Sequence, residues 1–82
     1  MDNHLKAIYC LQRLHLLINE GQTGTPLELA QKLQISRRHL YNMINLLKDS
    51  GADIKYSRSL QTFFYTKPFK LLKIFNEVFD KT

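Results

Sequence analysis

Cysteine and tryptophan are almost missing from this 82-residue chain, which contains one cysteine and no tryptophan. The single thiol, Cys10, has no partner for an internal disulfide, so an intracellular reducing compartment is expected. No histidine is spaced to form a nucleophile–base pair with Cys10, and His4, His15 and His39 lack the spacing of metal ligands. The sequence therefore predicts neither an enzyme nor a metal or cofactor site.

Long apolar runs are absent as well. No stretch approaches the roughly 18 consecutive apolar residues that cross a membrane. The start of the chain, Met1-Asp2-Asn3-His4, lacks the charged-then-apolar order of a secretory signal. Hydrophobic residues nevertheless make up 44% of the sequence, which suits one small globular domain with a modest core. We expect a soluble, cytoplasmic protein.

Acidic side chains are scarce relative to basic ones, with 7 against 12, which gives a net charge of +5. The excess is carried by residues 26–66 and 67–82, whereas the charges of residues 1–25 cancel. A positive field favours a polyanionic partner, most simply nucleic acid. Many small basic proteins bind nothing acidic, so the charge by itself is a weak indication.

The residues that are present are organised around one predicted helix over residues 36–50. Ser36 is a good N-cap, and Gly51 stands where a helix end favours a left-handed residue. Helical periodicity sets an apolar face against a face that carries donors and acceptors suited to phosphates and base edges. The apolar face comprises Leu40, Met43, Ile44 and Leu47, and the polar face comprises Arg38, Tyr41, Asn42 and Asn45. The alternative is an ordinary amphipathic helix with a polar outside.

A short helix is predicted immediately before it, over residues 26–33. Thr25 can cap this helix, Pro26 occupies its first position, and Glu28 can complete a capping box. Only two residues then separate it from Ser36. Two helices joined by so tight a turn, the second with a polar outer face, indicate a helix-turn-helix rather than a generic αα-hairpin.

After residue 51 the apolar period changes from 3.6 to 2, which predicts a β-hairpin. Residues 54–58 and 62–66 are β-prone, and residues 59–61 form the bend. A hairpin directly after a helix-turn-helix is typical of a wing, whose candidate phosphate contacts here are Lys55 and Arg58. Alternatively the hairpin closes the core, and both roles are compatible.

The end of the chain, from Pro68 to about Asp80, is predicted to be a helix that is apolar on more than one face. A domain this small cannot bury all of that surface, and contiguous exposed apolar surface marks an interface. We therefore expect a homodimer formed through residues 67–82. The alternative is a terminal helix that folds wholly onto its own domain. The expected contact residues are Leu71, Leu72, Phe75, Val78 and Phe79.

Periodic apolar residues also predict a first helix over residues 4–19, followed by a turn at residues 21–24. The predicted fold class is mainly α with a small β-hairpin. Residues 1–66 form a winged helix-turn-helix domain with a three-helix core, and residues 67–82 add a C-terminal helix.

One sequence motif in the middle of the chain resembles a known family. It reads Leu-Ala-x-x-Leu-x-Ile-Ser-Arg-Arg-x-Leu-Tyr over residues 29–41. This pattern is similar to the winged helix-turn-helix domains of DeoR-type and WYL-type bacterial regulators and of the biotin-operon repressor. The resemblance spans about residues 9–65 and implies that the cap serine, the two arginines and the tyrosine touch DNA. In this sequence those residues are Ser36, Arg37, Arg38 and Tyr41.

The leading hypothesis is thus sequence-specific binding of double-stranded DNA in transcriptional regulation. The helix over residues 36–50 would lie in the major groove. A winged helix used only for protein contact is the alternative. The expected DNA-binding residues are Ser36, Arg37, Arg38, Tyr41, Asn42, Asn45, Lys48, Lys55 and Arg58.

Overall fold

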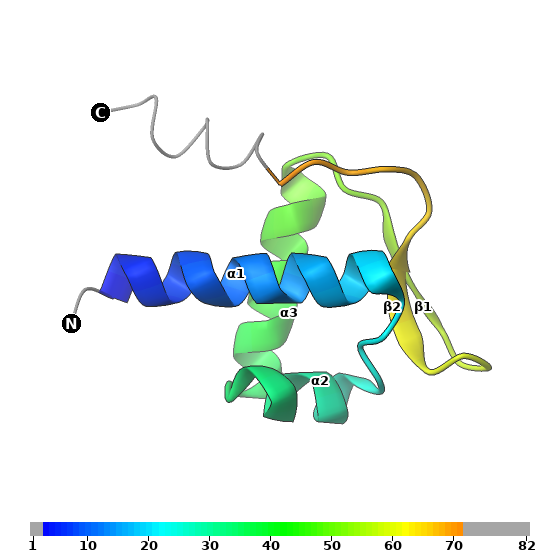
Figure 1. Ribbon diagram of the computed structural model, residues 1–82, viewed down its shortest axis with the longest axis horizontal. Coiled ribbons are helices and arrows are strands. Elements are labelled where there is room, and N and C mark those ends of the chain that lie inside the picture. The colour runs from blue at the N-terminus through cyan, green and yellow to red at the C-terminus, as the bar shows by residue number, and fades with distance from the viewer. Residues whose placement is uncertain (1–2, 72–82) are drawn as a thin grey trace.

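The computed structural model describes residues 3–71. It contains three helices followed by a two-stranded hairpin, which is the winged-helix arrangement predicted from the sequence (Figure 1). Each strand ends one residue earlier than predicted. The elements are α1 (Asn3–Glu20), α2 (Pro26–Leu33), α3 (Arg37–Asp49), β1 (Ile54–Ser57) and β2 (Thr62–Tyr65).

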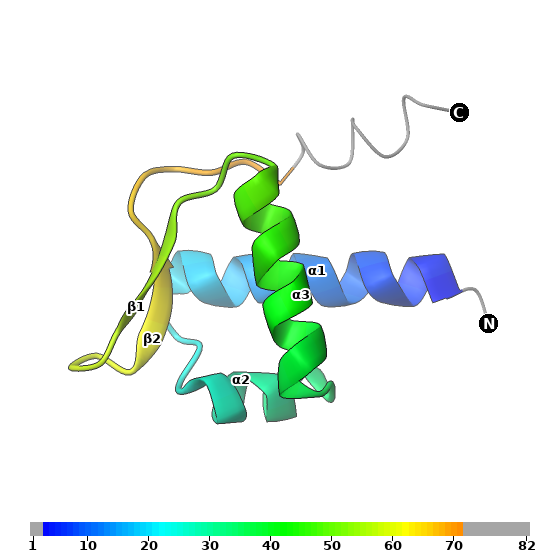
Figure 2. The ribbon, with the colours of Figure 1, turned by 180° about the vertical axis from the view of Figure 1, so that it is seen from behind.

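The core lies where α1 crosses α3, with α2 and the hairpin closing two of its sides. Figure 1 shows α1 in front of α3, and Figure 2 shows α3 in front of α1. The predicted apolar face of α3 is buried. On α2, Leu29, Ala30 and Leu33 are buried at helical spacing and form the face that meets the core. The largest fully buried side chains are Leu14, Ile18, Leu29, Leu40, Ile44, Leu47 and Thr23.

The N-terminus of α2 is closed by the predicted capping box. Glu28 N–H donates to Thr25 Oγ1 at 3.2 Å, and Thr25 N–H donates to Glu28 Oε1 at 2.9 Å. The bond that Thr25 N–H donates to the carboxylate lowers the pKa of Glu28, because it favours the ionised form. Two of the free donors of the first turn are thereby satisfied.

All three helices end in the same way, at a residue in the left-handed conformation. In each case this residue donates its N–H to the carbonyl three residues earlier, and the next residue donates to the carbonyl five residues earlier. Those residues are Gly21 (φ 66°), Gln34 (φ 57°) and Gly51 (φ 108°). After α2, for example, Ile35 N–H donates to Ala30 O at 3.0 Å. The glycine after α3 was predicted. The glutamine after α2 was not, because a side chain at positive φ is disfavoured.

The hairpin is fastened to the turn between α1 and α2 by two buried threonines. The strands are antiparallel, with Ser57 opposite Thr62 and Ile54 opposite Tyr65. Thr23 N–H donates to Thr62 Oγ1 at 3.1 Å, and Phe63 N–H donates to Thr23 Oγ1 at 2.8 Å. The start of β2, directly after the turn of the hairpin, therefore has a defined position relative to the helices.

The predicted start of a C-terminal helix at Pro68 is wrong for the residues that the structure describes. Residues 68–70 are irregular and residue 71 lies in a turn. Phe69 packs against the edge of the core, and Leu71 is buried within it. These contacts hold the backbone against the body in place of a helical turn. The rest of the predicted helix lies outside the described residues.

Candidate nucleic-acid interface

The polar face of α3 is open to solvent along its length. Arg38, Asn42 and Asn45 are all exposed, and the view from behind shows α3 in front of the other described elements (Figure 2). Tyr41 lies at the flank of this face with 44% of its surface exposed. The face therefore offers a guanidinium, two carboxamides and a phenol to a partner.

The N-terminus of α3 has the features of an anion-binding end. Ser36 is its N-cap, and Ser36 Oγ accepts from His39 N–H at 3.0 Å. A hydroxyl that accepts one bond still has its own hydrogen to donate. The first turn contains no acidic residue, and the exposed Arg37 and Arg38 add positive charge to the favourable helix dipole.

The opposite end of α3 is electrically mixed. Lys48 is exposed in the last turn, as predicted, and Asp49 beside it is exposed as well. The carboxylate of Asp49 partly offsets the charge of Lys48. The positive charge of α3 is therefore greatest at its N-terminal end.

The wing carries the two predicted cations, but at different structural positions. Lys55 is exposed on β1, opposite Phe64. Arg58 was expected on the strand and instead lies in the turn after it. The strand ends because Ser57 Oγ accepts from Leu60 N–H at 3.2 Å, which turns the chain. Arg58 is exposed at the tip of the wing.

A further cation, Lys32 on α2, is already engaged within the protein. Lys32 Nζ donates to Gln22 O at 3.1 Å and to Thr23 O at 3.2 Å. It thereby holds the α1–α2 turn against α2. Although Lys32 lies in the helix-turn-helix, its charge satisfies backbone carbonyls of the same chain.

The outer face of α3 also carries Leu46, which sequence reasoning missed. Its side chain is 46% exposed, although leucine usually favours the core. The available signal was its spacing, since it falls four residues after Asn42 and thus on the polar side of the helix.

Beside the hairpin, α1 and β2 are joined by an aromatic cluster. His15 Nδ1 and the Tyr65 hydroxyl oxygen are 2.8 Å apart, and Phe69 contacts both rings. Burial lowers the pKa of His15 and raises the pKa of Tyr65. The neutral form of each side chain is therefore favoured in the folded protein.

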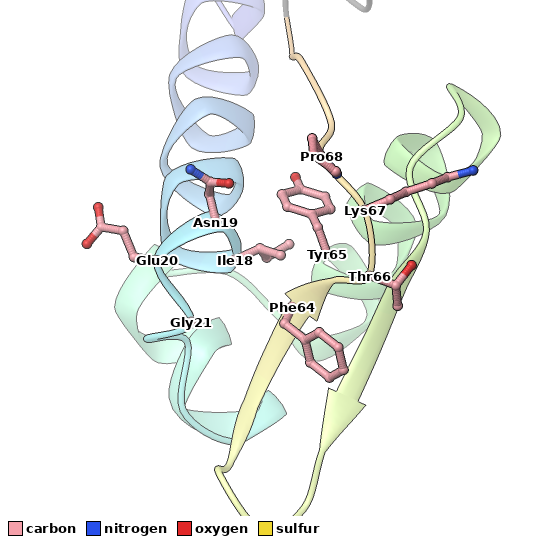
Figure 3. A pocket seen from close by; sticks show the side chains of 9 residues that line it. All are labelled: Ile18, Asn19, Glu20, Gly21, Phe64, Tyr65, Thr66, Lys67 and Pro68. Carbon is pink, nitrogen blue, oxygen red and sulfur yellow. The ribbon is translucent and has the colours of Figure 1, made fainter.

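An open groove of about 400 Å³ runs between the end of α1 and β2 (Figure 3). Its lining includes Glu20, Phe64 and Lys67 but no residue of α3.

Cys10 lies half-buried on α1, where burial raises the pKa of its thiol. Across residues 3–71 there is no cluster of three potential metal ligands. None of the described helices has both the length and the apolarity to span a membrane.

A comparison with known families identifies the family to which this chain belongs. A family model described as an HTH (helix-turn-helix) domain matches residues 11–60. The chain belongs to this HTH domain family. The match contains α2, α3 and β1, and it runs from the middle of α1 to the turn of the wing. The chain is an HTH domain of the DeoR, WYL and biotin-repressor type, which is a DNA-binding family and not an enzyme family. Comparison with curated proteins and with solved structures gave no match.

Proposed function

We propose that this HTH domain binds specific sequences of double-stranded DNA in transcriptional regulation, with α3 in the major groove. One observation carries the proposal. The helix that a DNA-binding HTH domain places in the groove presents an uncovered face of guanidinium and carboxamide groups. In a helix-turn-helix the second helix lies in the major groove, where its outward side chains can meet base edges.

The exposed side chains divide into two roles by their chemistry. Arg37 and Arg38 hold phosphates at the start of α3, and the hydroxyls of Ser36 and Tyr41 donate to phosphate oxygens. Later in the chain, three cations extend the backbone contacts: Lys48 on α3, Lys55 on β1 and Arg58 in the wing turn.

Two asparagines are the candidates for sequence recognition. Asn42 and Asn45 each present a carboxamide that can pair with N6 and N7 of adenine. Arg38 can alternatively reach O6 and N7 of guanine. A good bidentate contact discriminates against the wrong base by about 1–3 kcal/mol. Asn45→Ala is therefore expected to relax base preference at one position, whereas Arg37→Ala weakens binding to all sequences.

Selection of bound sequences from a random duplex pool tests the proposal directly. An enriched motif is expected, and its absence would overturn sequence-specific binding. A variant with Arg37→Ala and Arg38→Ala should lose affinity, and its salt dependence should flatten by about two units of slope. The matched control is Lys6→Ala with Arg13→Ala, which removes the same charge from exposed positions on α1. Equal losses in both double variants would contradict the assignment to α3.

We also propose that the protein acts as a homodimer through the end of the chain. Leu71 is buried in the core of its own domain, so it is not available to a second copy. The remaining expected contacts, Leu72, Phe75, Val78 and Phe79, lie outside the described residues. Sedimentation of the full chain should give a dimer, and a chain ending at Leu71 should give a monomer. A full-length monomer at micromolar concentration would contradict the dimer, and a palindromic DNA motif would support it.

A further inference from the structure

Leu46 occupies a place on α3 where about half of its surface is left exposed by its own domain. It is 46% exposed, and in the described part of the chain its side chain belongs neither to the core nor to the residues packed against it. Its neighbours one turn earlier along the helix are Asn42 and Met43, of which Asn42 is exposed and Met43 is buried. Leu46 thus lies at the edge of the face that carries the two carboxamides.

The backbone at Leu46 is held firmly by the end of the helix. Leu46 O accepts from Ser50 N–H at 3.1 Å and from Ser50 Oγ at 3.0 Å. The residues that follow close the helix through the left-handed Gly51. The position of this side chain relative to Asn42 is therefore fixed by regular helix geometry. It does not depend on a loop.

A major groove offers one common apolar group, which is the C5-methyl group of thymine. If α3 lies in the groove with its carboxamides against bases, Leu46 reaches the base edges beside them. We propose that Leu46 is a specificity-determining residue that recognises thymine through this methyl group. The inference rests on the proposed function, since it requires α3 to be the helix in the groove.

Helix geometry says where that thymine lies. Leu46 is four residues beyond Asn42, which is about 6 Å along the helix axis at a rise of about 1.5 Å per residue. Successive base pairs are about 3.4 Å apart. Because α3 can be inclined to the DNA axis, this distance is an upper limit, and the thymine lies within two base pairs of the adenine that Asn42 contacts. This spacing is a prediction for the selected motif.

The test replaces each thymine of the selected duplex, one at a time, with deoxyuridine, which lacks only the methyl group. Loss of one buried methyl group corresponds to about a fourfold loss of affinity. The protein should show that loss at one thymine in each half-site, and Leu46→Ala should bind the thymine and deoxyuridine duplexes equally at that position. The Asn42→Ala variant, selected on the same pool, identifies the adenine from which the spacing is counted.

The matched control is Leu16→Ala. Leu16 lies on α1 and is 47% exposed, so this substitution removes a leucine of similar exposure from another element. Leu16→Ala should retain the preference for thymine over deoxyuridine at every position. A preference that persists in Leu46→Ala, or a selected motif in which no deoxyuridine weakens binding, overturns the inference and leaves the proposed function intact. A random pool that yields no motif overturns both.

Discussion

The hydroxyl oxygens of Thr23 and Thr62 lie 3.1 Å apart inside the domain, although the residues are 39 positions apart in the sequence. Thr23 belongs to the turn between α1 and α2, and Thr62 begins β2. Thr62 Oγ1 also accepts from Thr23 N–H and donates to Phe63 O. The pair therefore joins the helical part of the fold to the hairpin through buried polar groups.

Thr62→Val should destabilise the domain, because it leaves the buried N–H of Thr23 without an acceptor. An unsatisfied buried donor costs about 1–3 kcal/mol. Urea unfolding measures the change in the free energy of unfolding. Thr66→Val is the control, since it removes a hydroxyl whose 2.6 Å bond to Asp53 Oδ2 is exposed. Its effect should be smaller, and equal losses would show that burial of the threonine pair is not decisive.

Gln34→Gly should raise the free energy of unfolding. Gln34 ends α2 at φ 57°, and a residue with a Cβ atom in this conformation is disfavoured by about 1 kcal/mol. Glycine removes that strain. Gln31→Gly, an exposed position inside α2, is the matched control and should cost about 1 kcal/mol because glycine weakens a helix interior. Thermal or urea unfolding of the two variants should give changes of opposite sign.

The stability of the domain should fall as the pH falls through the ordinary pKa of histidine, 6.5. Burial lowers the pKa of His15 in the folded protein, so the unfolded chain binds this proton more readily. Above that pH both states are neutral and the contribution of His15 is fully present, and it is lost towards the lower folded pKa. Unfolding measured between about pH 5 and 8 should show this slope.

His15→Gln should flatten that dependence on pH. The control is His39→Gln, which changes an exposed histidine on α3 and should leave the slope as it is in the parent protein. A parent protein whose stability is constant across the range would contradict the assignment to His15.

Replacing Lys48 and replacing Lys32 should have different effects on DNA binding and on stability, although both are exposed lysines near the end of a helix. Lys48→Ala should reduce the salt dependence of DNA binding by about one unit of slope and leave stability nearly unchanged. Lys32→Ala should instead lower stability by about 1 kcal/mol, because the carbonyls of Gln22 and Thr23 lose their donor. Equal reductions of the salt slope would show that Lys32 also contacts phosphate.

The parts of the fold that could be predicted from the sequence are those whose signals are local. The cap at Ser36, the stop at Gly51 and the capping box of α2 are each set by a few adjacent residues, and the structure contains all three. The exposure of the polar face of α3 followed from the periodicity of its apolar residues. Whether those polar residues contact DNA stays a prediction.

The parts that could not be predicted depend on contacts between distant segments. The position of Phe69 against His15 and Tyr65 is one such contact, and it accompanies an irregular backbone where Pro68 locally favours a helix. The bonds from Lys32 to the preceding turn are another. The left-handed conformation of Gln34 could not be predicted either. The tight turn between α2 and α3 imposes it, although a residue with a side chain does not favour it.

The hairpin is tied to the body by bonds that reach as far as Thr62, the first residue of β2 after the turn. In the part of the chain that the structure describes, the turn at residues 58–61 forms side-chain hydrogen bonds only within the hairpin, through Ser57. Segments of other length or charge can therefore be inserted between Ser57 and Thr62 without changing the packing of the helical core. An engineer who wants to change the strength of backbone contacts, and not the base preference set by α3, can therefore begin with this four-residue turn.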